Sequence, residues 1–272
     1  ALLLKLTTPA KVFDEVVHNI EVVFLLIFMV AGIYFMRDLL LYTLRKIVLR
    51  IKSGTLLAVM IVASAAFLSA FLDALTVMAG LISVCTGFYL IYQRVASGKH
   101  IEDTHPHENE LDDESHEFYE YHREDLEALR AFLRSLVMHG AVGTALGGVC
   151  TLVGEPQNLL IASAADWTFI EFFVRMAPVT MPVLFCGLAT TLILERTGWF
   201  GYGTEVPTNI RQMLEDVDLV KDQERTDHQK AALVVQGVVA VILIISLAFH
   251  ITEVGFIGLM IIILQTAFNG IV

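Results

Sequence analysis

Long apolar runs, separated by short charged segments, dominate this chain. The runs cover residues 22–36, 55–72, 74–92, 140–165, 169–194, 231–249 and 254–272. A helix needs about 20 apolar residues to cross a bilayer, and most of these runs approach that length. The pattern therefore predicts an all-α, polytopic membrane protein surrounded by a lipid bilayer.

The segments between these runs have patterns of their own. Residues 39–51 alternate apolar and basic side chains, as expected of a helix that lies at the membrane interface. Residues 126–137 have the spacing of an amphipathic helix. A polar loop is expected over 195–230, and a short turn over 250–253. Lysine and arginine gather in 37–53, in 94–134 and in 195–230, and this bias places those segments on the cytoplasmic side.

Composition supports the membrane assignment and narrows the function. Hydrophobic residues make up 56% of the chain and charged residues 17%, whereas soluble domains are about one quarter charged. Much of the net charge of −11 comes from the acidic loop at 97–127, which we expect to be solvated. No nucleic-acid partner is indicated. No phosphate-binding glycine loop or nucleophile triad is present, so neither an enzyme nor a bound cofactor is expected.

Asp73 is the first candidate site residue. It is the one charged residue between the apolar runs 55–72 and 74–92. An acid inside a membrane is costly and indicates a function. If the chain is helical here, Ser69 and Thr76 share its face, and these oxygens suit a hard cation such as Na+. The two runs form either two full spans, with Asp73 capping a helix at the interface, or a re-entrant hairpin with Asp73 at its tip.

The second candidate is the segment Gly143 to Asn158, where glycines, a proline and polar groups interrupt an apolar stretch. Glycines allow close backbone approach or unwinding, and Pro156 frees a carbonyl group of the preceding turn. Unwound carbonyl groups, together with Thr151 and Asn158, can coordinate a cation, and Glu155 is a second candidate acid. The alternative is a packing kink with an interface of small residues.

Histidine offers a further possibility, because its charge changes near neutral pH. His139 stands next to the interrupted segment and is a candidate pH sensor. The five histidines of the acidic loop lack a compact ligand spacing, so they are interpreted as part of a solvated, charged segment.

Four stretches resemble the NhaB family of bacterial sodium/proton antiporters. They are residues 28–36, 68–77 (LSAFLDALTV), 143–162 and 199–203 (WFGYG). The resemblance covers nearly the whole chain. The family belongs to a wider ion-transporter superfamily whose folds contain two inverted repeats. Each repeat has a re-entrant hairpin followed by an unwound helix, and the ion sites form between the repeats.

The resemblance implies a domain organisation. Residues 1–194 would form the first repeat, with the hairpin at about 55–93, a cytoplasmic acidic loop at 97–127 and the broken helix at about 140–165. Residues 195–230 would be a cytoplasmic linker, and 231–272 would start the second repeat. The chain is thus expected to be part of a longer, multi-pass protein of the bacterial inner membrane.

The resemblance also implies an activity and a site. Asp73 would carry Na+ or H+ alternately, and Li+ is a further candidate cargo. Thr76, Thr151 and Asn158, with carbonyl groups near Gly154 and Glu155, would complete the cation shell. An anion or dicarboxylate transporter of the same superfamily and a non-transporting membrane scaffold are the alternatives. Dicarboxylate transporters carry a Ser-Asn-Thr tip where this chain has Leu-Asp-Ala-Leu-Thr, which favours cation exchange. Membrane transporters often form homodimers, and a homodimer is compatible with this chain.

Overall fold

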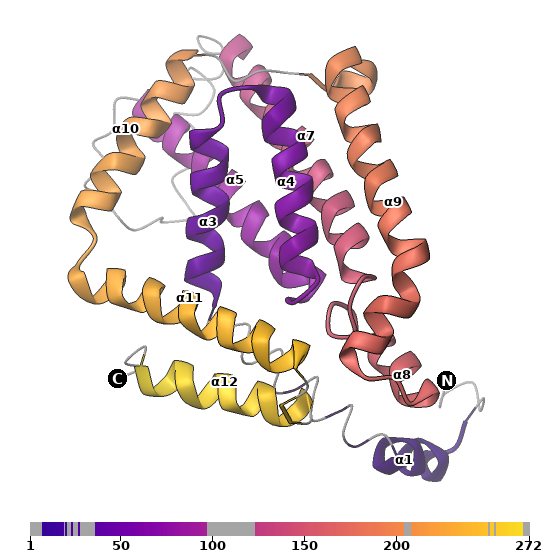
Figure 1. Ribbon diagram of the computed structural model, residues 1–272. Helices are drawn as coiled ribbons and strands as arrows, with labels where there is room; N and C mark the ends of the chain where they lie inside the picture. Colours follow the sequence, from indigo (N-terminus) through magenta and orange to yellow (C-terminus); the bar gives the residue numbers. More distant parts are fainter. Residues whose placement is uncertain are drawn as a thin grey trace.

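Helices make up all the regular structure in the part of the chain that the computed structural model describes. That part comprises residues 7–18, 20, 23, 27, 36–96, 123–203, 208–249, 251–252 and 254–268. The helices are α1 (Pro9–His18), α3 (Arg37–Arg50), α4 (Gly54–Ser69), α5 (Ala74–Ala96), α7 (Arg123–Gly148), α8 (Pro156–Ala165), α9 (Phe169–Thr197), the short 3-10 helix η1 (Trp199–Gly201), α10 (Thr208–Glu224), α11 (Asp227–Ala248) and α12 (Val254–Phe268) (Figure 1). The expected all-α fold is confirmed.

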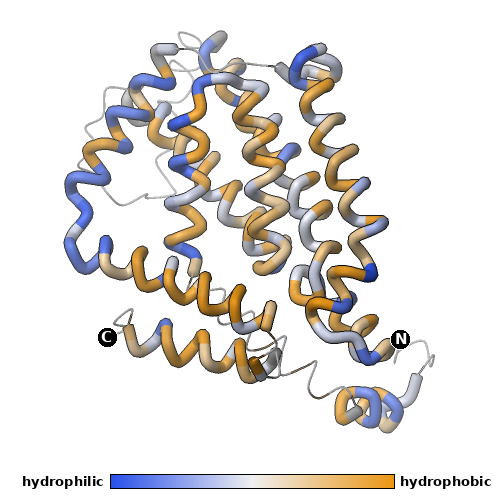
Figure 2. The backbone as a smooth tube through the Cα atoms, viewed as in Figure 1, coloured by the Kyte–Doolittle hydropathy of each residue, from blue (hydrophilic) through white to orange (hydrophobic). Residues whose placement is uncertain are grey.

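Three of these helices are long and apolar enough to cross a membrane. They are α5 over Ala74–Gln93, α9 over Phe169–Thr197, and α11 over Asp227–Ala248. Apolar residues make up most of α4, α9, α11 and α12, whereas α10 is largely hydrophilic (Figure 2). These helices identify a membrane protein. At a rise of 1.5 Å per residue, the 16 residues of α4 extend only about 24 Å, less than the ~30 Å hydrocarbon core.

Helices α4 and α7 form the centre of the fold. Helix α9 packs beside them, while α3 and α5 pack on the other side (Figure 1). Helix α11 passes below the lower end of α3 in this view and also contacts α9, and α12 packs along α11. The buried core follows the same order, with Leu44 of α3, Ile61 of α4, Leu81 of α5 and Leu129 of α7 almost fully covered.

Glycines let α7 approach the backbone of α4 directly. A Cβ atom on Gly143 would lie 2.6 Å from the carbonyl oxygen of Val62, and one on Gly147 would overlap the backbone of Ala66. Only glycine fits at such a contact. This is the spacing of small residues that brings membrane helices together, where apolar burial alone gives no preference between lipid and protein.

Two expectations are corrected by the helix bounds, and two others cannot be compared with the described residues. The interrupted segment does not begin near Gly140, since α7 is continuous from Arg123 to Gly148 and its glycines serve packing. Residues 195–230 are mostly helical rather than a loop, because α9 extends to Thr197 and α10 occupies Thr208–Glu224. The expected span at 22–36 and the acidic loop up to residue 122 lie largely outside the described residues.

A cluster of ion pairs joins α3 to α10. Lys46 Nζ lies 2.7 Å from Asp218 and also contacts Asp222, while Arg45 Nε lies 2.6 Å from Asp218. Burial lowers the pKa of Lys46, but its hydrogen bonds to Asp218 and Asp222 outweigh this effect and raise it above its ordinary value. Burial raises the pKa of Asp222, but the Lys46 hydrogen bond and nearby positive charges outweigh this and lower it. The cluster stabilises both charged forms.

The α4–α7 contact yields a test of packing. Replacing Gly147 with leucine should strongly destabilise the full-length protein, because the side chain would collide with the Ala66 backbone rather than with a movable side chain. Gly237→Leu in α11 is the matched control, since nothing lies within 4 Å of its Cβ position. Thermal unfolding in detergent would measure both. Equal unfolding temperatures for the two variants would contradict the close contact.

The ion cluster yields a pH prediction. A lowered pKa in the folded state means that Asp222 contributes stability above its unfolded value, near pH 4, and that this contribution is lost as the pH falls through the folded value. Asp222→Asn should therefore destabilise the protein by about 1 kcal/mol at pH 7 and by less near pH 3. Asp216→Asn, exposed on the same helix, is the control. A deficit that does not shrink on acidification would refute the role of the charge.

Candidate functional site

The helical path breaks between α7 and α8, over residues 149–155. Two side chains hold this break in place. Asn158 Nδ2 donates to the carbonyl oxygens of Gly148 at 2.9 Å and Thr151 at 2.8 Å. Thr151 Oγ1 donates to the carbonyl oxygen of Ala70, at the end of α4. Both side chains are buried. The break is thus fixed to the end of α4 by hydrogen bonds.

The local sequence explains the break. Pro156 occupies the first turn of α8, where its missing N–H group is tolerated, and it prevents α7 from continuing. Gly154 lies against the backbone, because a Cβ there would be 2.8 Å from the carbonyl oxygen of Ser69 and closer to that of Gly148. Leu152 and Val153 are buried and anchor the segment. Irregular backbone at membrane depth needs such cover by protein.

Side-chain oxygens gather beside this break. A Cβ on Gly148 would lie 3.0 Å from Glu155 Oε1 and 3.2 Å from Ser69 Oγ, so both groups reach the space over Gly148. Ser69 Oγ is fully buried and has no hydrogen-bond partner within the described residues. Glu155 Oε2 accepts a hydrogen bond from Gln157 Nε2. The break therefore offers a carboxylate and an unused hydroxyl next to backbone carbonyl groups.

Asp73 caps the start of α5. Its Oδ1 accepts the N–H of Leu75 at 2.8 Å, and its Oδ2 accepts the N–H of Thr76 at 3.1 Å and the Thr76 hydroxyl at 2.5 Å. The carboxylate is half-buried. A carboxylate has about four lone-pair positions, so three hydrogen bonds leave room for one further ligand. The cap and the pairing with Thr76 were both among the expectations for this residue.

The candidate residues thus form two groups. Thr151, Gly154, Glu155 and Asn158 lie together at the break, with Ser69 and Ala70 of the α4 end. Asp73 and Thr76 lie at the start of α5. No hydrogen bond or ion pair between the two groups is found in the described part of the chain. Ser69 does not share a helical face with Asp73, because α4 ends at Ser69 and the chain turns before α5.

A buried polar cluster between α7 and α9 was only half anticipated. His139 Nε2 lies 2.7 Å from Glu195 Oε1, which also accepts the hydroxyl of Ser135 at 3.0 Å. Glu195 Oε2 accepts the N–H of Gly203 at 3.2 Å, and the ring of Tyr202 packs on His139. Glu195 was assigned to a polar loop. The position of Glu195 directly after the apolar run 169–194 was the sequence feature that could have indicated this contact.

Among the described residues, no group of three or more histidine, cysteine, aspartate and glutamate side chains is arranged to hold a metal ion. The oxygen atoms at the break and at Asp73 are of another kind: a single acid in each group, with hydroxyl and carbonyl oxygens. Such hard oxygen donors suit a hard cation such as Na+.

The whole chain matches a known family. Residues 1–272 match the family described as "Bacterial Na+/H+ antiporter B (NhaB)". The chain belongs to the NhaB family. Relatives named Na(+)/H(+) antiporter NhaB include those of Hahella chejuensis, 55% identical over 272 residues, and of Pseudomonas fluorescens, 58% identical over 271 residues. No solved structure gives a significant match to the chain.

The match to the NhaB relatives covers this chain fully but each relative only in part. All of this chain is covered, but only 54% of the Hahella chejuensis protein and 53% of the Pseudomonas fluorescens protein. The chain therefore spans about half the length of the curated relatives that it matches. Both groups of candidate residues, at the α7–α8 break and at the start of α5, lie within the matched half.

The break yields a stability prediction. Asn158→Ala removes the donors for two buried carbonyl groups, and unsatisfied buried groups cost about 1–3 kcal/mol each, so the full-length protein should lose at least ~2 kcal/mol. Ser163→Ala, exposed on the same helix, should change stability little. Denaturant unfolding in detergent measures the difference. Similar stability of the two variants would show that Asn158 does not hold the break.

Proposed function

We propose that the full-length protein is a secondary transporter that exchanges Na+, or Li+, for H+ across the bacterial inner membrane. The observation that carries this proposal is the match of the entire chain to the NhaB family, whose relatives are named Na(+)/H(+) antiporters. The two groups of oxygen-rich, partly buried residues support it. The family match does not favour the dicarboxylate-transporter or scaffold alternatives.

In this proposal Asp73 is the group that holds Na+ or H+ in turn. Its three hydrogen bonds fix the carboxylate and leave a lone pair open for one ion. The N-terminus of α5 carries partial positive charge, which weakens the hold of the carboxylate on a cation. A site that holds Na+ weakly and can also take a proton suits exchange. Thr76 positions the carboxylate through its hydroxyl group.

The break supplies the second part of the proposed cation shell. Among the described residues Ser69 Oγ is buried without a partner, and Glu155 Oε1 reaches the same space, so a desolvated cation could bind both oxygens. Thr151 and Asn158 position this backbone, and Gly154 allows the close approach. The two groups would come together around an ion when α5 moves relative to the break.

We further propose the membrane arrangement that the family resemblance suggests. Helix α4 is too short to cross the hydrocarbon core, which supports a re-entrant hairpin with the turn at 70–73 inside the membrane. The inverted second repeat would lie in the half of the relatives that this chain does not match. Its helices and a homodimer partner are candidates to cover the apolar face of α9, where Val174, Val179 and Phe185 are exposed.

Asparagine at position 73 provides the sharpest test. Asparagine caps helices as well as aspartate does, so Asp73→Asn should keep α5 intact while removing the charge that binds the ion. In inside-out vesicles containing the full-length protein, Na+ should collapse an imposed pH gradient for the wild type and not for Asp73→Asn. In the wild type, the Na+ concentration at half-maximal rate should rise as the pH falls, because H+ competes for the carboxylate.

Two controls separate the outcomes. Asp216→Asn, on the exposed face of α10, should leave exchange unchanged. Glu155→Gln tests whether the acid at the break takes part in exchange. Exchange retained by Asp73→Asn but lost in Glu155→Gln would move the ion site to the break, and a pH-independent half-maximal Na+ concentration would refute competition at one group.

A further inference from the structure

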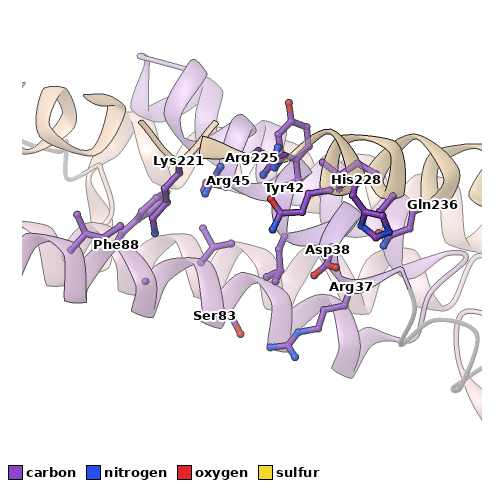
Figure 3. A pocket seen from close by; sticks show the side chains of 17 residues that line it. Arg37, Asp38, Tyr42, Arg45, Ser83, Phe88, Lys221, Arg225, His228 and Gln236 are labelled. Carbon is purple, nitrogen blue, oxygen red and sulfur yellow. The ribbon is translucent and has the colours of Figure 1, made fainter. Parts of the chain in front are cut away.

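A cavity of about 930 Å³ opens between α3, α5 and the segment that joins α10 to α11. This volume lies in the range of ligand-binding pockets in proteins. It is remote in sequence from the α7–α8 break, and none of the ion-site candidates lines it. Figure 3 shows its side chains, with Lys221 and Phe88 at one end and His228 and Gln236 at the other.

Three helices each contribute one face to this cavity. The lining positions repeat every three to four residues along α3, α5 and α11, so each helix presents a single stripe. The stripes are Arg37, Asp38, Leu41, Tyr42 and Arg45 of α3; Ser83, Val84, Gly87, Phe88 and Ile91 of α5; and His228, Gln229, Ala232, Leu233 and Gln236 of α11. The α5 and α11 stripes belong to helices that are apolar enough to span a membrane.

The polar part of the lining carries positive charge. Among the described lining residues, four are basic, namely Arg37, Arg45, Lys221 and Arg225, and one is a carboxylate, Asp38. Arg45 and Arg225 also pair with Asp222 outside the cavity, and Arg225 stacks on Tyr42. In that cluster Arg45, Lys46 and Arg225 face two carboxylates, those of Asp218 and Asp222, so one positive charge remains uncompensated.

Two donors in the lining are available to a ligand. The guanidinium group of Arg37 has no ion-pair partner within the described residues. Gln236 is 98% buried; its Oε1 accepts the N–H of Leu39 at 2.8 Å, and its Nε2 has no protein partner in the described part. The Gln236 amide and the Arg37 guanidinium both line the cavity, and each is a donor that an anionic oxygen would satisfy.

The position of the cavity identifies the kind of anion. Its basic groups come from the charged helices α3 and α10 and the residues just before α11, while its apolar groups come mainly from the apolar helices α5 and α11. Such a boundary between charged and apolar surface is where phospholipid headgroups lie. Basic pockets between membrane helices bind anionic lipids in this way.

We propose that this cavity binds one anionic phospholipid. The phosphate group would contact Arg37 and Gln236, and the acyl chains would follow Leu41, Phe88 and Leu233 toward the hydrocarbon core. Bound there, the lipid would join α3 to α11, which otherwise meet in the hydrogen bond between Gln236 and the Leu39 N–H group. The site is separate from the proposed ion site, so it stands whether or not Asp73 carries Na+.

Glycine 87 allows the cavity to be blocked without disturbing the fold. No atom lies within 4 Å of its Cβ position, so a leucine there would project into the open space. Gly237→Leu is the matched control, because position 237 is equally open and does not line the cavity. Both changes place the same side chain in a spanning helix.

Native mass spectrometry of the delipidated full-length protein, titrated with phosphatidylglycerol or phosphatidylcholine, tests the proposal. We expect wild type and Gly237→Leu to retain one phosphatidylglycerol in preference to phosphatidylcholine, and Gly87→Leu to lose this preference. Arg37→Gln should weaken phosphatidylglycerol binding by about five-fold, the effect expected for removing one basic side chain beside an anionic headgroup.

The remaining outcomes would overturn the assignment. Equal retention of both lipids by the wild type, or unchanged phosphatidylglycerol binding in both Gly87→Leu and Arg37→Gln, would exclude this site. Displacement of phosphatidylglycerol by millimolar glycerol phosphate would identify a soluble phosphate ester as the ligand. Absence of any bound lipid in the full-length wild type would mean that the protein itself fills the cavity.

Discussion

Direct backbone contact between α4 and α7 is the constraint on which the rest of the structure depends. Gly143 and Gly147 bring α7 against Val62 and Ala66, at distances that no side chain permits. The end of α7 is thereby placed beside the end of α4. Only with the two ends together can Thr151 reach the carbonyl group of Ala70, and Gly154 that of Ser69. The break in the helical path is therefore shaped by packing that begins two turns earlier.

The polar and charged contacts of the molecule have different roles in different places. The α3–α10 cluster is partly exposed, and its ion pairs hold one helix against the other. The His139–Glu195 contact is buried, and every oxygen of Glu195 has a donor, so it fixes α7 to the end of α9. In contrast, Ser69 Oγ has no hydrogen-bond partner in the described part of the chain, and Glu155 Oε1 reaches the same space over Gly148. Unmatched oxygen atoms distinguish the candidate site from the structural contacts.

The sequence predicted this structure well where one physical signal dominated. Apolar length gave the helices, and the conjunction of glycine, Pro156 and polar groups gave a break whose residues the structure brings together at 149–155. The onset of the break was placed too early, because glycine serves close packing and unwinding equally well and only the partner helix decides between them. Glu195 was missed for a related reason: an acid at the end of an apolar run is exposed or buried according to which helix lies opposite, and His139 is 56 residues away. No local sequence pattern predicted the cavity, because its lining comes from single faces of three separate helices.

The N-terminal cap of α5 offers a way in which a proton or an ion on Asp73 could affect distant parts of the protein. The same two oxygens that would receive an ion also hold the first amide groups of a 23-residue helix. A proton on this acid would weaken those bonds, whereas a bare carboxylate strengthens them. In the proposed mechanism, the geometry of the first turn of α5 would therefore depend on whether Asp73 holds a proton or an ion. Helix α5 runs without interruption from Ala74 to Ala96. The gain or loss of one proton at its first turn could therefore shift its other end.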